Sequence, residues 1–302
     1  MRRPPSVLIA VTAAFMSVIM IAGSEAKVHG ASAAQHGVAP SPDGPEHMAH
    51  ETWWPVTLPI RPASGFEGLT DRALLATQQA AAKDAELSVL VLDRETGRTA
   101  SNGQVTPIVT ASVVKLFIAD DLLQQHWPLS PEDRAALDAM LRSSDDNAGE
   151  DFWWRGDGAD IVTRVAERYG LRNTFPPPDG QWWNTITDAS DLVRYYDMLL
   201  DGTGGLSRDK AAIIIGDLAE STPLGIDGYP QRFGIPDGLY REQVAVKQGW
   251  MCCIGPDWMH LSTGIVDGRY IMVVESREPG DDTAARDTIT EAVRTMFPDG
   301  RI

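Results

Sequence analysis

Hydrophobic and polar residues alternate along this chain with two distinct periods. Spacings of three and four residues predict helices over 69–82, 112–125, 131–142, 146–154, 158–169, 188–201, 207–219 and 281–296. Apolar runs predict strands over 87–93, 243–251, 258–266 and 269–275, the first followed by a polar turn at 94–97. Predicted strands therefore lie on both sides of a long helical stretch.

The order of these elements predicts an α+β fold. Strands from the two ends would form an antiparallel sheet flanked by helices, with an all-helical subdomain of about residues 113–215 inserted between them. A length of 302 residues is enough for a sizeable core, and we expect one folded domain over 53–302.

The N-terminus has the pattern of an export signal. Arg2 and Arg3 precede an apolar run over 7–23, and small residues follow at Ser24 and Ala26. We expect a signal peptide over 1–26 and a periplasmic, cell-wall-associated or extracellular location. The run is also long enough for an uncleaved anchor, which would be the one membrane contact. No cysteine lies near it, so we expect no lipid on a new N-terminal cysteine.

Residues 27–52 are rich in Ala, Gly, Pro, Ser and His and have no apolar periodicity. This composition predicts a flexible linker. Four of the six histidines of the chain lie there, so metal scavenging is an alternative, but a spacer is the better interpretation.

Charge and cysteine content exclude several classes of function. A formal net charge of -16 argues against binding to nucleic acids. His126 and His260 are far apart and no H-x-x-x-H pattern occurs in the folded part, so we expect no metal and no cofactor. Cys252 and Cys253 are adjacent, and two buried thiols are expected rather than a vicinal disulfide.

A possible nucleophile lies in the segment Ala-Ser-Val-Val-Lys. Ser112 and Lys115 are three residues apart, which places them on one face if the segment is the first turn of a helix. A serine nucleophile needs a base beside it, and a lysine can serve when burial or nearby positive charge lowers its pKa. The spacing alone is weak, because serine and lysine are common.

Two later segments add polar groups. Ser143, Ser144, Asp145, Asp146 and Asn147 follow one another between two predicted helices, where a helix N-cap is the simpler interpretation. The apolar strand 243–251 contains Lys-Gln-Gly-Trp at 247–250. A glycine in a strand often permits close approach by a ligand, whereas a lysine there can also protect an edge strand.

Taken together and in this order, the three segments resemble the motifs S-x-x-K, S-D-N and K-T-G of the penicillin-recognising serine enzymes. That superfamily includes the class A β-lactamases and the D-alanyl-D-alanine peptidases. The resemblance covers roughly residues 66–300 and implies a β-lactamase-like fold.

The resemblance also implies roles for residues at the matching positions. Ser112 would be the acylated nucleophile, Lys115 its base, and Ser144 a proton relay to the leaving group. Lys247 would supply positive charge to a substrate carboxylate and help to lower the pKa of Lys115. The N–H groups of Ser112 and Trp250 would form an oxyanion hole. The substrate-binding positions would be Asp146, Asn147, Gln248, Gly249 and Trp250.

Three departures from the motifs qualify this resemblance. Asp146 or Asn147 could fill the asparagine position, and an anion there would hold Lys115 protonated. Gln248 replaces the usual hydroxyl residue. Class A β-lactamases have a loop glutamate that activates water, but the corresponding segment 174–184 has only Asp179, which is expected to form a turn. Glu167 lies nearby on a helix and is expected to face solvent.

We therefore expect an exported serine hydrolase that forms an acyl-enzyme on Ser112. Its substrate would be a peptidoglycan-type peptide, a β-lactam or an ester, with slow or absent turnover of β-lactams. The alternative is a catalytically weak or inactive homologue that binds cell-wall fragments or a protein partner.

Overall fold

We describe residues 65–302 of a computed structural model, without the side chain of Cys253. The expected signal peptide at 1–26 and linker at 27–52 lie outside these residues. Within them, no helix combines the length and the apolarity needed to cross a bilayer.

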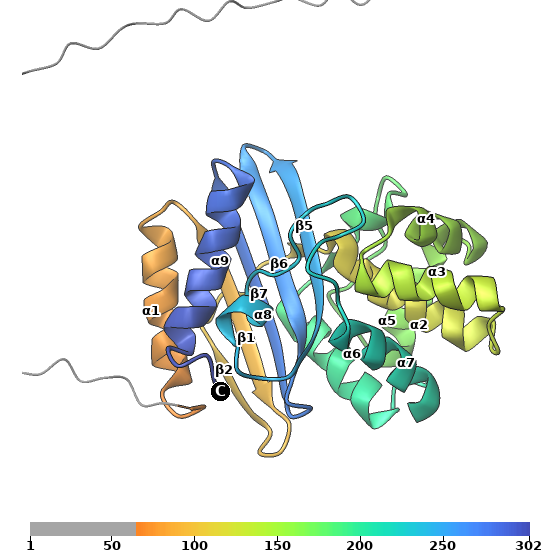
Figure 1. Cartoon of the computed structure of the whole chain (residues 1–302), viewed down its shortest axis with the longest axis horizontal. Coiled ribbons are helices and arrows are strands. Elements are labelled where there is room, and N and C mark those ends of the chain that lie inside the picture. Colours follow the sequence, from red (N-terminus) through yellow and green to blue (C-terminus); the bar gives the residue numbers. More distant parts are fainter. Residues whose placement is uncertain (1–64) are drawn as a thin grey trace, which may run out of the picture. The chain divides into compact units, whose positions relative to one another are not determined.

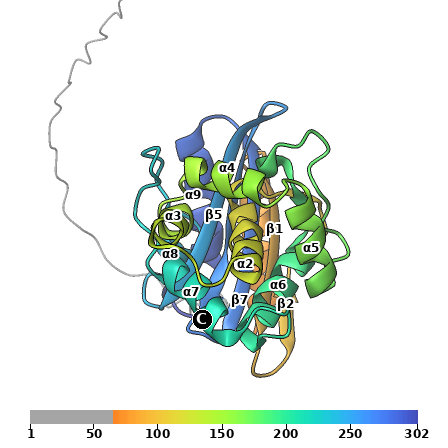
Figure 2. The same cartoon turned by 90° about the vertical axis from the view of Figure 1, so that its right-hand side faces the viewer.

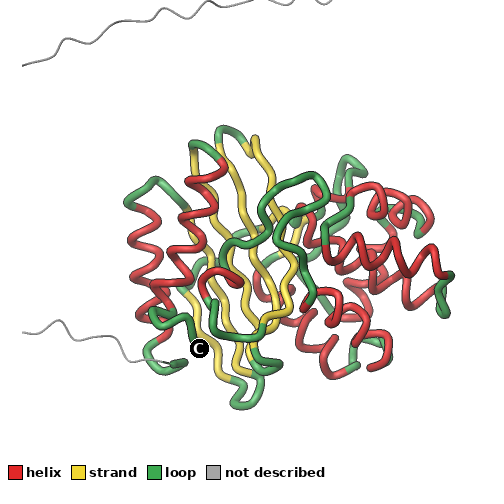
Figure 3. The backbone as a smooth tube through the Cα atoms, in the orientation of Figure 1, coloured by secondary structure: helices red, strands yellow, loops and turns green. Residues whose placement is uncertain are grey.

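Five antiparallel strands form the central sheet, in the order β2-β1-β7-β6-β5 (Figure 3). Their bounds are Glu86–Asp93 (β1), Arg98–Ser101 (β2), Val244–Ile254 (β5), Asp257–Val266 (β6) and Tyr270–Pro279 (β7). Strands from opposite ends of the chain meet at the centre, where Val89 pairs with Val274. β5 is left at the edge of the sheet, and this edge strand carries Lys247.

The two faces of the sheet pack against different sets of helices (Figure 1). Side chains alternate along a strand, so Val89 and Val91 of β1 face one core while Leu90 and Leu92 face the other. The first core is covered by α1 (Leu69–Ala81), α9 (Asp282–Met296) and the short α8 (Ile235–Gly238).

Six helices pack on the other face. They are α2 (Lys115–Gln125), α3 (Pro131–Arg142), α4 (Asp146–Arg155), α5 (Asp160–Tyr169), α6 (Ala189–Asp201) and α7 (Arg208–Ala219). α2 runs through the middle of this group (Figure 2), and all of its residues up to Leu123 are buried. Its two buried carboxylates are paired: Asp120 with Arg168 and Asp121 with Arg164, both on α5.

The expected α+β class is confirmed, and the predicted helices and strands agree with the observed ones to within a few residues. The chief difference is at Ser112, where a 3₁₀ turn (η1, Ala111–Val114) precedes α2. A two-stranded ribbon of β3 (Ile108–Val109) and β4 (Ile186–Thr187), and a second 3₁₀ turn (η2, Trp182–Asn184), have no counterpart in the prediction. The subdomain boundary of about 113–215 stays a prediction.

The cysteine prediction is wrong for Cys252, which is exposed and disulfide-bonded. The register of β5 against β6 shifts between Met251 and Ile254, just before the turn at Gly255. The strand is irregular there, and this irregularity leaves Cys252 at the surface rather than in a core.

Candidate active site

Ser112 and Lys115 are brought together by the 3₁₀ turn that opens α2. Residues three apart lie directly above one another in a 3₁₀ turn. Lys115 Nζ accordingly lies 3.0 Å from Ser112 Oγ. Lys115 is completely buried, and Ser112 is nearly so.

The turn has a distinctive backbone on its N-terminal side. Ala111 has a φ of 44°, in the left-handed region that a non-glycine residue seldom adopts. The residue before it is tied to the β4 side, because Thr110 N donates to Thr185 O over 2.9 Å. The position of the nucleophile is thus set by a segment some seventy residues away in the sequence.

Gly249 of β5 packs directly against this turn. A Cβ at Gly249 would lie 2.7 Å from the carbonyl oxygen of Thr110 and 3.3 Å from Ala111. The sequence predicts a glycine that permits close approach by a ligand. The structure corrects this expectation, because the group that approaches Gly249 is the protein's own backbone. Gly249 brings β5 close to Ser112.

A chain of hydrogen bonds continues from Lys115 through Ser144 to Lys247. Lys115 Nζ lies 2.8 Å from Ser144 O and 3.3 Å from Ser144 Oγ, and Lys247 Nζ lies 2.8 Å from the same Oγ. Ser144 presents both oxygens because its φ of 58° turns the backbone sharply between α3 and α4. The four residues predicted as catalytic therefore form one buried network.

Burial lowers the pKa of the Lys115 amine, and the neighbouring Asp146 carboxylate opposes this shift. The pKa of Lys247 is also lowered, first by burial and then by the charge of Lys115. A lower pKa increases the fraction of the amine that is neutral at a given pH, and a lysine must be neutral to act as a base.

Asp146, rather than Asn147, occupies the position beside Lys115, where the two side chains form an ion pair. Asn147 is exposed on the next position of α4, so its predicted role in substrate binding is not supported. The cause is the N-cap. Asp145 is the N-cap of α4 and accepts hydrogen bonds from the N–H groups of Asn147 and Ala148, so Asp146 is the first helical residue and Asn147 the second.

Gln248 is also corrected as a substrate-binding residue. Successive side chains of a strand point to opposite faces, and Gln248 points away from Lys247. Its Nε2 donates to the carbonyl oxygens of Gln231 and Phe233 over 3.0 and 2.6 Å. Gln248 thus holds the loop between α7 and α8 rather than facing Ser112.

A cleft of about 310 Å³ opens onto Ser112. It is lined by Ala111, Ser112, Asp146, Trp182, Trp183, Asp227, Trp250 and Met251. Trp250 was predicted to contribute and does line the cleft. Trp182 and Trp183 also border the cleft. Trp182 is nevertheless almost fully buried, with Lys115 Nζ 4.8 Å from its ring centre.

Several residues at this site were not among the sequence candidates, including Asp227 and Gly149. Asp227 reaches the cleft from an irregular loop that has no motif to reveal it. Gly149 lies inside α4, where a Cβ would approach Lys115 Cε to 3.1 Å. A glycine inside a helical pattern often marks close packing, so this signal was present in the sequence.

The 174–184 segment contains no glutamate, so it cannot place one beside Ser112. Asp179 instead accepts hydrogen bonds from Gln181 N and Asn184 Nδ2 over 3.0 and 2.7 Å, which confirms it as a turn former. The carboxylate of Glu150 on α4 accepts from Trp182 Nε1 over 2.9 Å. The side of Lys115 that faces this segment is therefore covered by an indole ring.

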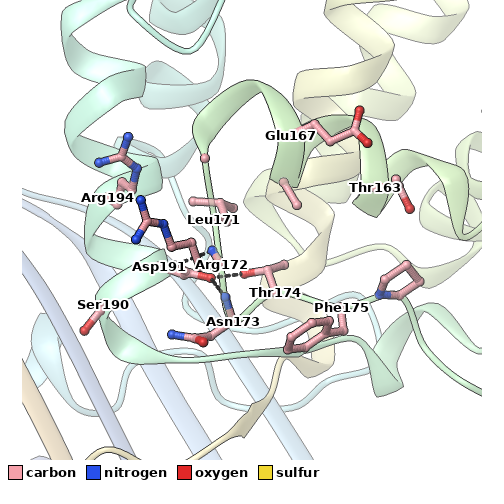
Figure 4. Close-up of a pocket in the computed structure, with 13 residues that line it drawn as sticks. Thr163, Glu167, Leu171, Arg172, Asn173, Thr174, Phe175, Ser190, Asp191 and Arg194 are labelled. Atoms are coloured by element: carbon pink, nitrogen blue, oxygen red, sulfur yellow. Dashed lines mark hydrogen bonds between the residues drawn. The ribbon is translucent and has the colours of Figure 1, made fainter.

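A larger cavity of about 710 Å³ lies between α5, α6 and the 170–176 segment (Figure 4). Its buried carboxylate, Asp191, accepts hydrogen bonds from Arg172 N, Asn173 N and Thr174 Oγ1. Glu167 lines this cavity and is exposed, as expected. Its lining contains no lysine beside a serine, and the Ser112–Lys115 pair opens onto the smaller cleft instead.

This fold, with its paired serine and lysine at the junction of sheet and helices, is that of the penicillin-recognising serine enzymes. A β-lactamase from Chitinophaga pinensis matches with a TM-score of 0.59 at 14% identity, over 76% of this chain and 98% of that chain. The TLA-1 extended-spectrum β-lactamase gives 0.60 at 16%, over 76% and 98%. PBP-A gives 0.59 at 18%, over 76% and 96%. At these identities the likeness establishes the fold.

Sequence comparison identifies the family. The chain is 56% identical over 315 aligned positions, covering 100% of both sequences, to proteins of Mycobacterium tuberculosis and Mycobacterium bovis named "Putative lipoprotein LppW". No protein-family profile matches it. The chain belongs to the LppW family.

Proposed function

We propose that this protein is an exported serine hydrolase that forms an acyl-enzyme on Ser112. The observation that carries this proposal is the 3.0 Å approach of the buried Lys115 amine to Ser112 Oγ. A serine with such a neighbour, opening onto a cleft, has the arrangement of an activated nucleophile.

The first step transfers the proton of Ser112 Oγ to a neutral Lys115 amine as Oγ attacks the substrate carbonyl. The N–H groups of Ser112 and Trp250 are proposed to bind the oxyanion that forms. Collapse of this intermediate breaks the bond to the leaving group, which takes a proton through Ser144. The product of the step is an ester on Ser112 and a protonated leaving group.

Ser144 suits the relay because its hydroxyl bridges the two lysines, 3.3 Å from Lys115 Nζ and 2.8 Å from Lys247 Nζ. The proton taken up by Lys115 can pass along this bridge to the leaving group. A protonated Lys247, held in place on β5, donates a hydrogen bond to Ser144 Oγ. It therefore favours the developing negative charge during transfer.

Hydrolysis of the acyl-enzyme is expected to be slow. Trp182, rather than a carboxylate, covers Lys115 on the side of the 174–184 segment. An indole ring cannot take a proton from water. We therefore propose substrates whose esters on Ser112 are long-lived, drawn from peptidoglycan-type peptides, β-lactams or simple esters.

A catalytically weak homologue that binds cell-wall fragments or a protein partner is the second candidate. The ion pair of Asp146 with Lys115 favours it, because the anion stabilises the protonated amine. This function needs the cleft but not the nucleophile.

Export to the cell envelope is supported by the N-terminal pattern of charged, apolar and small residues. The name of the mycobacterial relatives contains the word lipoprotein and agrees with that location.

The test is covalent labelling of residues 53–302, followed by intact-mass spectrometry. An uncharged alkyl fluorophosphonate and a fluorescent penicillin are used in parallel on the parent chain, Ser112→Ala and Ser143→Ala. Ser143 is the matched control, because its hydroxyl bonds to Ala139 O and not to either lysine.

We expect the fluorophosphonate to add to the parent chain and to Ser143→Ala but not to Ser112→Ala. Absence of an adduct with every probe, and no hydrolysis of simple esters, would reject the hydrolase and favour the binding homologue.

A further inference from the structure

The catalytic cleft carries negative charge at its surface. Its lining contains two charged side chains, Asp146 and Asp227, and both are exposed carboxylates. Asp146 is paired with Lys115, while Asp227 Oδ1 accepts a hydrogen bond from Tyr229 N over 2.9 Å. Asp145 lies directly behind them as the cap of α4.

The cations of the site are hidden behind this surface. Lys115 and Lys247 are 0% and 1% exposed, and neither contributes to the lining of the cleft. Lys247 is already bonded to Ser144. Arg286 lies 4.9 Å from the ring centre of Tyr229, but its guanidinium pairs with Asp282 and does not line the cleft.

Aromatic faces complete the lining. Trp183 packs edge-on against Trp182 at 5.0 Å between ring centres, and Trp250 stacks on Tyr229 at 4.7 Å with an angle of 8°. Trp183 and Trp250 are half-buried, so part of each indole remains accessible. Indole faces next to carboxylates attract organic cations through their quadrupole and through charge.

The amide of Gln248, which could bind a substrate carboxylate, points away from the cleft. The amide of Gln248 donates to the loop carbonyls of Gln231 and Phe233, on the far side of β5 from Lys247. A carboxylate-bearing substrate would therefore meet Asp146 and Asp227 with no exposed cation or free amide from β5 to balance it.

We propose that the cleft selects an acyl donor that carries a cationic amino or ammonium group and discriminates against one that carries a carboxylate. This inference rests on the proposed acyl-enzyme function and narrows its substrate class. Asp227 is the specificity-determining residue, since it faces the cleft without touching Ser112 or Lys115. Trp183 and Trp250 provide the aromatic walls for the cation.

The test uses three esters of 7-hydroxycoumarin with acyl chains of matched length. The chains end in a trimethylammonium group, a tert-butyl group or a carboxylate. The rate of acylation is measured from the burst of released coumarin, and the adduct on Ser112 is verified by mass. We expect the cationic ester to react about tenfold faster than the anionic one at low salt, with the neutral ester between them. The ratio of these two rates should fall at high salt, because salt screens the charges of the two exposed carboxylates.

The negative net charge of the whole chain favours cations as well, so a matched variant is needed. Asp227→Asn should reduce the ratio of the cationic to the anionic acylation rate several-fold. Asp209→Asn, which removes the same charge from the exposed start of α7, should leave it unchanged. An equal reduction by both variants would assign the preference to net charge and overturn the proposal.

The outcomes also separate this inference from the function on which it rests. Equal rates for the three esters, or a fastest anionic ester, with Ser112 still labelled by the fluorophosphonate, reject the cation preference alone. Absence of any adduct on Ser112 rejects the acyl-enzyme itself.

Discussion

Asp146 sets the protonation of the proposed base. Its carboxylate pairs with Lys115 and raises the pKa of that amine against the lowering effect of burial. A base must be neutral to accept the proton of Ser112, so the aspartate would slow the proposed acylation near neutral pH.

Asp146→Asn removes this restraint. We expect the pKa of Lys115 to fall, so that a larger fraction of the amine is neutral at pH 7. Labelling of Ser112 by the fluorophosphonate should become several-fold faster at pH 7, and its rise with pH should move to lower pH. The measurement is the labelling rate between pH 5 and pH 10.

Asp151→Asn is the control for this prediction. Asp151 lies on the same helix, but its carboxylate is exposed and pairs with Arg155. We expect its pH profile to match that of the parent chain. An unchanged profile in Asp146→Asn would mean that Lys115 is not the base.

The resemblance to the three motifs predicted the catalytic candidates Ser112, Lys115, Ser144 and Lys247, and the structure brings all four together. Side-chain direction could not be predicted in the same way. Asn147 and Gln248 have suitable chemistry but do not line the cleft, and the alternation of side chains along β5 turns Gln248 away from Lys247.

At the scale of elements, α4 depends on its N-terminal cap. Asp145 accepts two backbone hydrogen bonds, from Asn147 N at 2.8 Å and Ala148 N at 3.2 Å. These two bonds satisfy backbone N–H groups of the first turn, which have no partner within the helix. The same cap determines which residue of the next turn faces Lys115.

Asp145→Ala should lower the free energy of unfolding by about 1 kcal/mol. Asp145→Ser retains a capping oxygen and should recover most of this loss. Asp151→Ala, on the same helix but not at its cap, should cost about 0.5 kcal/mol or less. Denaturant-induced unfolding measures all three, and an Asp145→Ala chain as stable as the parent would contradict the role of the cap.

The longer helices and strands could be predicted because their periodicity extends over seven or more residues. Short elements could not. The 3₁₀ turn at Ser112 and the β3–β4 ribbon depend on pairing between Thr110 and Thr185, which lie far apart in the sequence. Local patterns contain no information on such a contact.

At the scale of the whole molecule, one buried acid in the central strand β7 links stability to pH. Glu275 is 4% exposed, and burial raises its pKa to about 7. In the unfolded chain a glutamate ionises near pH 4.3. Between about pH 4.3 and pH 7 the folded state binds more protons, so this residue makes stability fall as pH rises.

Glu275→Gln should therefore be more stable than the parent at pH 8 and show little difference at pH 4. The gain at high pH is on the order of 3 kcal/mol. Unfolding free energies at pH 4, 6 and 8 provide the measurement. Glu167→Gln, at an exposed position of α5, controls for the loss of one negative charge. A pH-independent difference between Glu275→Gln and the parent would contradict this account.

The sequence by itself determined the class of fold, because that class depends on local periodicity, and its three motifs identified the candidate residues Ser112, Lys115, Ser144 and Lys247. Only the tertiary structure decided that Asp146 pairs with Lys115, that Trp182 covers it, and that Asp227 reaches the cleft. The first two contacts join α2 to α4 and to η2, and Asp227 comes from the loop before α8. They depend on strand register, on helix caps and on the packing of segments distant in sequence, and hydrophobic patterning specifies none of these individually.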